Sequence, residues 1–493
     1  MNKPVSRAAG WTRSIFLHGK WYVLANLVSK TTIVILLPVY TKYFTPKEYG
    51  TLNSLNSIGQ LVGIIISLNL EAALCRFYHD TNRSREKLGT LISTLYFFIL
   101  GWGLLIVGLV LLSSRYWAET LLGVPVWPYI VLAYTPYVYI QLWGLGFHYL
   151  RESLKAREAT GLLIVYNFTS LALTLVLLLG FGFDIKARLI GNAAAGLINF
   201  IIITWMFASK GLLTFKVDFY KFKNWLLFSL PLIPNAAGTW IANFSDRIII
   251  SRYDSLFSTG LYGFAVQLAH IIYVLQDSII QVLLPVSQSG LKHKNAETIT
   301  TITHFSRLLF VLLLYLCFVL FLFSREMILI IVKMGQGDVS YLESAILVSI
   351  IALTYLLTAQ YRLFTSIITY HKKTWITSTG GIMMAGTNLA LNLIFIPVYG
   401  RTAAAYTTVC ASLLYTCWII SWACRLENIK LKYGFYIFMS ILYSISITAI
   451  NLFFPGLLDF SWLHVAIKVA VCLAILAVFF LSRKYWNKTG TGT

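Results

Sequence analysis

Charged side chains are scarce in this sequence. Only 12% of its 493 residues are charged, and 18 acidic residues stand against 39 lysines and arginines. A soluble domain of this length exposes more charge, so one large soluble core is excluded. Hydrophobic residues make up 58% of the chain, and apolar runs of about 20 residues recur along it, which is typical of membrane-spanning segments.

Cysteine is also rare, and its placement excludes a disulfide framework. The six cysteines lie almost entirely within apolar segments. Cys410, Cys417 and Cys424 recur every seven residues, and we interpret them as small packing residues rather than metal ligands. No glycine-rich phosphate-binding loop is present. We therefore expect no cofactor and no metal.

Apolar windows predict about fourteen transmembrane helices. Barrel strands would be short and alternating, so the predicted fold class is an all-α polytopic membrane protein. The predicted spans lie near residues 21–40, 52–72, 89–112, 126–149, 160–180, 187–207, 228–251, 260–284, 303–323, 344–366, 375–398, 402–423, 433–454 and 462–482.

The distribution of basic residues predicts the orientation. An even number of spans places both termini on one side, and 26 of the 39 lysines and arginines fall on that side against 10 on the other. The positive-inside rule then places both termini in the cytoplasm. The net charge of +21 is explained by this topology and by attraction to membrane lipids, so nucleic acid is not an expected partner.

One short motif occurs twice. YTKYFTPKEYG (40–50) and YDSLFSTGLYG (253–263) share Tyr, Phe, Tyr and Gly at an offset of 213 residues. A second echo, SLALTLVLLLGFG (170–182) and NLALNLIFIPVYG (388–400), has an offset of 218. Both copies of the first motif follow an odd-numbered span, where we expect a tight external turn at the glycine.

The repeat predicts the domain organisation. Two six-helix lobes, 1–208 and 226–425, should enter the membrane in the same direction and be related by a pseudo-two-fold axis along the membrane normal. A basic cytoplasmic linker, 209–225, joins them, and 426–493 adds an accessory pair of spans and a cytoplasmic tail. Substrate would then bind in a cavity between the lobes.

Polar residues within spans are candidates for that cavity, because burying them in a bilayer is costly. Hydrogen bonds between helices are the alternative explanation for the amides. Lys30 is an isolated cation midway along the first span, where a structural hydrogen bond would not need a charge. The predicted substrate-binding residues are Asn26, Lys30, Asn53, Gln60, Asn235, Asn243, Arg247 and Gln267.

Four titratable residues are candidates for ion coupling: Asp277, Asp246, Glu71 and His270. Asp277 is favoured because its own helix offers no adjacent cation, whereas Asp246 is expected to pair with Arg247. A structural hydrogen-bonding role is the alternative for Asp277, and a packing role for His270.

Other intramembrane features have simpler explanations. Arg307 and Arg362 lie near cytoplasmic ends of spans and can snorkel, and Lys468 in the last span can snorkel or face a neighbour. Pro231 and Pro234 should break the seventh span near its start.

Three stretches carry a family resemblance: PVYTKYFTPKEYGTLN, SLPLIPNAAGTWIANFSDRIIISRY and NLALNLIFIPVYGRTAAAYTT. They resemble polysaccharide flippases of the MOP exporter superfamily, most closely the O-antigen (Wzx-type) branch. The resemblance implies a bacterial inner-membrane protein that carries undecaprenyl-pyrophosphate-linked oligosaccharide from the cytoplasmic to the periplasmic leaflet. It also implies ion-coupled alternating access, and glycan polymerase and chain-length proteins of the same pathway as further partners.

Two other functions compete with this one. A small-molecule or multidrug exporter of the same superfamily would favour an acidic cavity, which Lys30 argues against. A membrane glycan polymerase or glycosyltransferase would need a sizeable external loop with carboxylates, whereas the external loops here are short. We therefore expect a transporter and not an enzyme.

Overall fold

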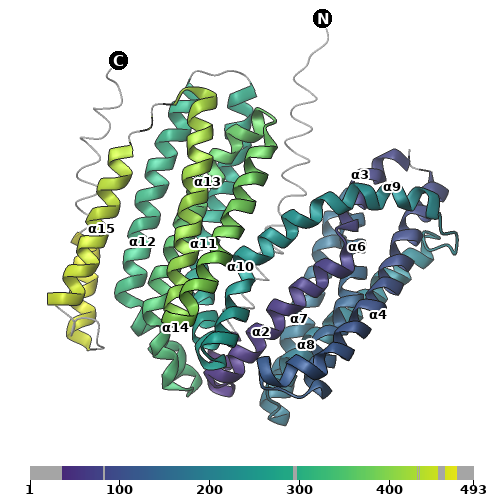
Figure 1. Cartoon of the computed structure of the whole chain (residues 1–493), viewed down its shortest axis with the longest axis horizontal. Coiled ribbons are helices and arrows are strands. Elements are labelled where there is room, and N and C mark those ends of the chain that lie inside the picture. The colour runs from purple at the N-terminus through teal and green to yellow at the C-terminus, as the bar shows by residue number, and fades with distance from the viewer. Residues whose placement is uncertain are drawn as a thin grey trace, which may run out of the picture. The chain divides into compact units, whose positions relative to one another are not determined.

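The structure, a computed structural model, describes residues 36–81, 84–292, 297–429, 431, 433–453 and 461–474. Every regular element in these ranges is helical, and none is a strand (Figure 1). The all-α fold class is confirmed, because helices satisfy their own backbone hydrogen bonds in a bilayer. The elements are α2 (Pro46–Ser67), α3 (Leu70–Tyr78), η1 (His79–Thr81), α4 (Arg85–Leu122), η2 (Val126–Ile130), α5 (Val131–Tyr134), α6 (Pro136–Glu152), α7 (Ala156–Phe181), α8 (Lys186–Ser209), α9 (Phe219–Ser229), η3 (Leu230–Leu232), α10 (Ile233–Tyr253), α11 (Leu256–Lys292), α12 (Glu297–Gly335), η4 (Val339–Ser344), α13 (Ala345–Tyr370), α14 (Thr374–Glu427) and α15 (Tyr433–Phe453).

The membrane-spanning helices agree with the sequence prediction. Ten helices in the described ranges are long and apolar enough to cross a bilayer, and α2 with α3 and η1 forms an eleventh, bent by 45°. The 54-residue α14 contains two predicted spans, because Gly400 interrupts it with φ +58°. The two remaining predicted spans, 21–40 and 462–482, lie partly outside the described residues.

The described chain divides into two compact units. Unit 1 comprises the residues up to Gly263 together with Gly335–Asp338 and Asn392–Arg401. Unit 2 comprises Phe264–Met334, Val339–Leu391 and the described residues from Thr402 onward. Helix α10, the seventh predicted span, groups with unit 1. The division into six-helix lobes at 208 and 226 stays a prediction.

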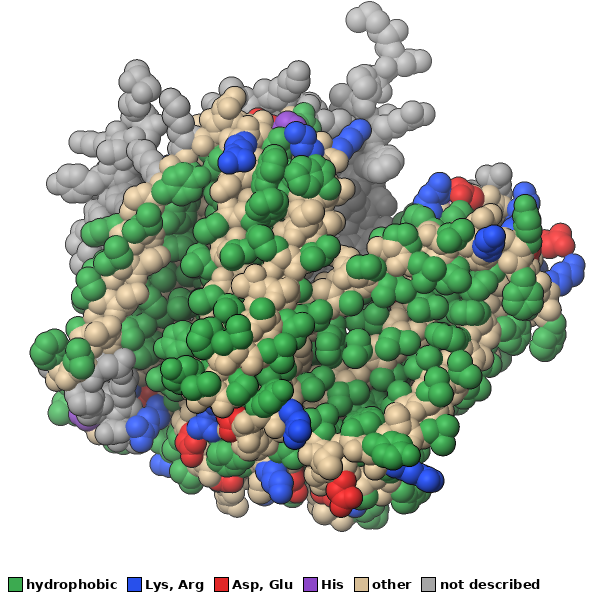
Figure 2. Space-filling view, in the orientation of Figure 1, with side chains coloured by type: hydrophobic (Ala, Val, Ile, Leu, Met, Phe, Trp, Pro, Cys, Tyr) green, Lys and Arg blue, Asp and Glu red, His purple; other side chains and the backbone are tan. Residues whose placement is uncertain are grey.

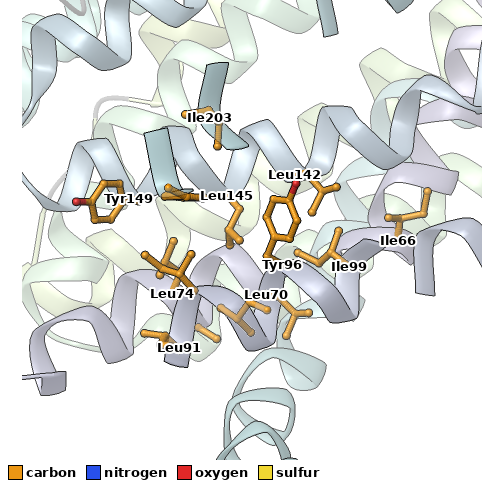
Figure 3. Packing of buried hydrophobic residues seen from close by; sticks show 14 of the residues in the cluster. Ile66, Leu70, Leu74, Leu91, Tyr96, Ile99, Leu142, Leu145, Tyr149 and Ile203 are labelled. Carbon is orange, nitrogen blue, oxygen red and sulfur yellow. The ribbon is translucent and has the colours of Figure 1, made fainter. Parts of the chain in front are cut away.

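Unit 1 has a core between α2, α3, α4, α6 and α8. Figure 3 shows Leu70, Leu142, Ile203 and their neighbours pointing toward one another from these helices. Gly146 allows α8 to come close, since a Cβ there would lie 2.4 Å from Ile203 Cγ2. Within a bilayer such close packing, rather than release of water, holds helices together.

Unit 2 has its own core, which joins α12, α13 and α14. Phe364, Ile367 and Ile376 are fully buried there against Ile419. A polar contact accompanies it, since Ser306 Oγ of α12 donates to Gln360 Oε1 of α13 at 2.7 Å. This bond fixes the register of the two helices by satisfying two polar groups in an apolar surrounding.

Two neighbouring spans of unit 1 are interrupted. Leu68 and Asn69 take left-handed conformations, with φ +46° and +55°, between α2 and α3. At the expected proline position the helix tightens into a 3₁₀ turn, η3, which contains Pro231 and joins α9 to α10 within the span Phe219–Tyr253. α2 packs against α10, and α3 packs against α9. Each half of one span therefore lies against one half of the other.

On the face that Figure 2 shows, charged side chains lie near the ends of the helices. Figure 2 shows hydrophobic side chains covering the middle of both units, with lysine, arginine and carboxylate groups at the two ends of the helices. This distribution is what a bilayer requires of a spanning protein.

Candidate functional site

Ten of the twelve predicted site residues lie on α2, α3, α10 and α11. Asn26 and Lys30 lie outside the described residues. Their role in substrate binding therefore stays a prediction.

A buried charged cluster lies near the end of α10. Asp246 is 4% exposed and Arg247 is 8% exposed. Asp246 Oδ1 accepts the backbone N–H of Arg247 at 2.8 Å and lies 3.5 Å from Arg247 Nη1. The hydroxyl of Tyr262 donates to Asp246 Oδ2, and Arg247 Nη1 donates to the carbonyl of Asn243. Asp246 and Arg247 thus form the pair that their adjacency predicted, with Tyr262 completing it.

Tyr262 is the second tyrosine of the repeated motif, so the repeat reaches this cluster. The structure corrects the expectation that Gly50 lies in a turn. Gly50 lies inside α2, which begins at Pro46 with a capping box between Thr45 and Glu48. A Cβ on Gly50 would lie 1.8 Å from the carbonyl oxygen of Leu256 in α11. The glycine is therefore required for the close approach of two helices.

The same close approach holds from the other side. A Cβ on Gly260 would lie 1.8 Å from the carbonyl oxygen of Pro46, and one on Gly263 would lie 2.6 Å from the side chain of Asn53. The first turn of α2 and the first turns of α11 are thus in backbone contact. This contact links the two copies of the motif.

The amides of α2 and α10 keep to their own helices. Asn53 Nδ2 donates to the carbonyl of Tyr49 at 2.8 Å, and Asn243 Nδ2 donates to the carbonyl of Thr239 at 2.7 Å. Gln60, Asn235 and Asn243 are exposed. Because these bonds use amide nitrogens, the amide oxygens remain as acceptors on a helix surface that crosses the membrane.

A tryptophan joins these two helices. Trp240 Nε1 of α10 donates to the carbonyl of Ser57 in α2 at 2.7 Å. This bond fixes the relative rotation of α2 and α10.

Unit 2 contains the remaining candidates on α11. Asp277, 8% exposed, accepts from Arg362 Nη1 of α13 at 2.6 Å and from Gln281 Nε2 at 2.6 Å. Arg362 therefore does not simply snorkel. Asp277 was favoured because its own helix offers no adjacent cation, but a cation reaches it from another helix.

His270 of α11 lies in an aromatic group. Its ring stacks on Tyr273 at a centroid distance of 4.8 Å and meets Tyr355 edge-on at 5.9 Å. Gln267, one turn earlier, is half-buried. The arrangement provides flat aromatic faces beside a titratable ring.

Glu71 lies directly after the break in the second span. It is in the first turn of α3 and is half-buried. Among the described residues no lysine, arginine or histidine lies within ion-pair distance of its carboxylate. Glu71 differs in this from Asp246 and Asp277, each of which has an arginine partner.

Two charged residues make contacts whose partners the sequence did not specify. Lys468 faces a neighbour, which was one of the two alternatives for it: it is fully buried and binds Glu326 of α12, which is 4% exposed. Arg188, counted as a residue of an external loop, lies inside α8 and donates to Ser170 of α7 at 2.7 Å. A signal was present for both, since each is a charge within or bordering an apolar run.

No metal centre is found in the part of the chain that the structure describes, where no group of three histidine, cysteine or carboxylate side chains could hold an ion.

Outside the spans, Asp218 caps α9 by accepting from the backbone of Lys221 at 2.9 Å. The hydrogen bonds from Lys221 lower the pKa of the Asp218 carboxyl.

Comparison with known proteins gives the family and the fold. Residues 19–291, more than half of the chain, match the family described as polysaccharide biosynthesis protein. The chain is also 22% identical over 294 residues to the Lsg locus putative protein 1 of Haemophilus influenzae, an alignment that covers 57% of this chain and 67% of the relative.

Solved structures of transporters share the fold. The lipid II flippase MurJ in an inward closed conformation superposes with a TM-score of 0.69 at 16% identity, covering 94% of this chain and 99% of MurJ. An inward-facing multidrug resistance MATE family transporter of the MOP superfamily gives a TM-score of 0.66 at 12% identity, covering 81% and 96%. At these identities the likeness establishes the fold.

Proposed function

We propose that this chain, which belongs to the polysaccharide biosynthesis family, is a flippase that moves a lipid-linked oligosaccharide across the membrane by ion-coupled alternating access. The proposal includes undecaprenyl pyrophosphate as the lipid carrier, a bacterial inner membrane and cytoplasmic termini. The family, the transporter fold and the many apolar helices support it.

The observation that carries the proposal is the polar face of α10. Within a helix that is long and apolar enough to span the bilayer, Asn235, Thr239 and Asn243 are exposed. Amides facing lipid would cost free energy, so such a face fits a water-filled path. Their oxygens suit the hydroxyl groups of a sugar, which donate hydrogen bonds.

The ion-coupling role is best assigned to Glu71. Protonating Asp246 would leave Arg247 buried without its counterion, and protonating Asp277 would do the same to Arg362. Glu71 can take up and release a proton without leaving a cation unpaired. It also borders a helix break, and discontinuous helices form the substrate and ion sites of many transporters.

Titratable groups of α6 contact α3 one turn after Glu71. Cys75 of α3 lies 3.7 Å from His148 Nδ1 and 3.9 Å from Arg151 Nη2, both of α6. In proteoliposomes, Glu71→Gln should abolish stimulation of transport by a proton gradient, whereas the exposed Glu158→Gln should retain it. Equal stimulation in both variants would refute the assignment.

Export of small molecules is the second candidate, because the fold is shared with a multidrug transporter. A deletion strain separates the two. If the chain is the flippase, lipid-linked oligosaccharide accumulates on the cytoplasmic leaflet after deletion, and surface glycan is lost. An unchanged surface glycan together with increased drug sensitivity would favour the exporter.

The glycan polymerase and chain-length proteins of the same pathway are proposed as partners, because they would act on the product that this flippase delivers. Membrane lipids are the remaining expected partners.

A further inference from the structure

An arginine of unit 1 reaches the middle of a neighbouring helix. Arg188 is the third residue of α8 and therefore lies close to the start of that helix. Its guanidinium donates through Nη1 to the hydroxyl of Ser170 in α7 at 2.7 Å. Ser170 in turn donates to Asn192 Oδ1, one turn along α8, at 2.7 Å.

The depth of Ser170 decides what this contact means. Ser170 lies 11 residues before Phe181, the last residue of α7, which is about 16 Å along a helix that rises 1.5 Å per residue. Half the hydrocarbon thickness of a bilayer is about 15 Å. The Ser170 hydroxyl is therefore near the middle of the span.

The packing of α7 against α8 shows the direction of the Arg188 side chain. A Cβ on Gly191, three residues further into α8 than Arg188, would lie 2.9 Å from the carbonyl oxygen of Ser170. Because Asn192 shares the Ser170 hydroxyl with Arg188, the side chain of Arg188 extends along α8 toward Gly191 and Asn192. An arginine near a helix end that served only as an interfacial anchor would extend the other way, toward water.

Arg188 is half-buried and has no carboxylate counterion among the described residues. Its neighbour Lys186 pairs with Asp184 at 3.4 Å, and the arginines of α10 and α13 pair with Asp246 and Asp277. A guanidinium has five N–H donors, and within the described part of the chain the structure gives those of Arg188 one hydroxyl acceptor.

A hydrogen bond between α7 and α8 would not explain this residue, because Asn192 with Ser170 already supplies one. Adding a cation to such a contact costs free energy in a membrane interior. The cost is offset when an anion binds, and a planar guanidinium can bind two phosphate oxygens at once.

We propose that Arg188, oriented by Ser170 and Asn192, binds a phosphate group of the lipid carrier within unit 1. The inference rests on the proposed function, which supplies a pyrophosphate-linked substrate. It adds a binding residue on α8 to those predicted on α2 and α10.

The test is equilibrium binding of farnesyl pyrophosphate, with uncharged farnesol as the reference probe, to the purified full chain in detergent. Arg188→Gln should weaken pyrophosphate binding by on the order of 10- to 100-fold, since it removes charge-assisted hydrogen bonds. Arg188→Lys should lose less, because it keeps the charge. Farnesol binding should not change.

Lys186→Gln is the matched control. It removes a positive charge two residues before Arg188, and the Lys186 side chain already has a carboxylate partner in Asp184. Its affinity for farnesyl pyrophosphate should stay within about twofold of the parent, as for other exposed, solvent-screened charges. Equal affinities of the Arg188→Gln and Lys186→Gln proteins, both folded by size-exclusion chromatography, would overturn the proposal.

Two further outcomes separate this inference from the proposed function. Arg188→Gln could alter binding only of an intact lipid that carries an acidic glycan, and not of farnesyl pyrophosphate. In that case Arg188 binds the sugar, and the phosphate assignment is wrong. If the parent protein binds farnesyl pyrophosphate through Arg188 but moves no lipid-linked oligosaccharide in liposomes, the inference holds and the proposed function fails.

Discussion

The buried ion pair between Lys468 and Glu326 gives a prediction that can be worked through in numbers. Lys468 lies in the helix Trp462–Ala474, and its side chain is fully buried, while that of Glu326 is 6% exposed. Lys468 Nζ donates to Glu326 Oε1, and Glu326 Oε2 has no hydrogen-bond partner among the described residues. The pair therefore has little solvent to replace a lost partner.

Lys468→Met should destabilise the protein strongly. Removing one member of a buried pair costs on the order of 3–5 kcal/mol, because the remaining charge stays buried without compensation. The cost of a lone lysine in mid-span, about 2.5–3.5 kcal/mol on insertion scales, predicts a similar loss for Glu326→Gln. The double variant Lys468→Met with Glu326→Leu should recover most of the stability, since it buries no charge.

The measurement is thermal unfolding of the purified chain in one detergent, followed by tryptophan fluorescence. The control is Lys155→Met, which breaks the surface pair with Glu158 at 3.1 Å, where both side chains are 40% or more exposed. Such pairs contribute about 0–1 kcal/mol. A midpoint for Lys468→Met as high as that for Lys155→Met, or a double variant no better than the single ones, would refute the reasoning.

Three further predictions follow from other contacts. Gly50→Val should cost at least 1–3 kcal/mol in the same unfolding assay, because its side chain must displace backbone; an unchanged midpoint would contradict the close approach. Asp277→Asn should lower the midpoint, and adding Arg362→Gln should restore it, because the pair is then removed as a whole; absence of rescue would argue against pairing. Asp218→Asn should remove the stabilisation that the Asp218 carboxylate gives to the start of α9. Because Lys221 lowers the pKa of this carboxyl, that contribution is present above the ordinary aspartate pKa and is lost as pH falls through the lowered value. Amide exchange of α9 that is equal in both proteins at pH 7 would contradict it.

Much of the fold could be predicted from the sequence because a bilayer leaves few choices. Apolar runs must be helices, and the 3₁₀ turn at Pro231 follows from a missing N–H and a steric clash. The break at Leu68 and Asn69 carries no such signal. Both residues adopt left-handed conformations. Asparagine tolerates this conformation better than leucine does, and no proline or glycine marks the position.

The candidate site was predictable only where partners are neighbours in sequence. Asp246 and Arg247 are adjacent, so their pairing could be expected. Arg362 reaches Asp277 from a helix 85 residues away, and no local pattern contains that contact. Arg188 shows a second limit, because the direction of a long side chain at the end of a helix depends on the hydrogen-bond partners that the neighbouring helix provides.

The central claim is that the chain moves a lipid-linked oligosaccharide between leaflets. The most direct test is reconstitution of the purified protein into liposomes that contain a fluorescent polyprenyl-pyrophosphate-linked oligosaccharide, with a membrane-impermeant quencher added outside. The account predicts that lipid protected in the inner leaflet becomes quenched at a rate that rises with the amount of protein and with a proton gradient. A rate equal to that of protein-free liposomes, with folded protein present, would contradict it.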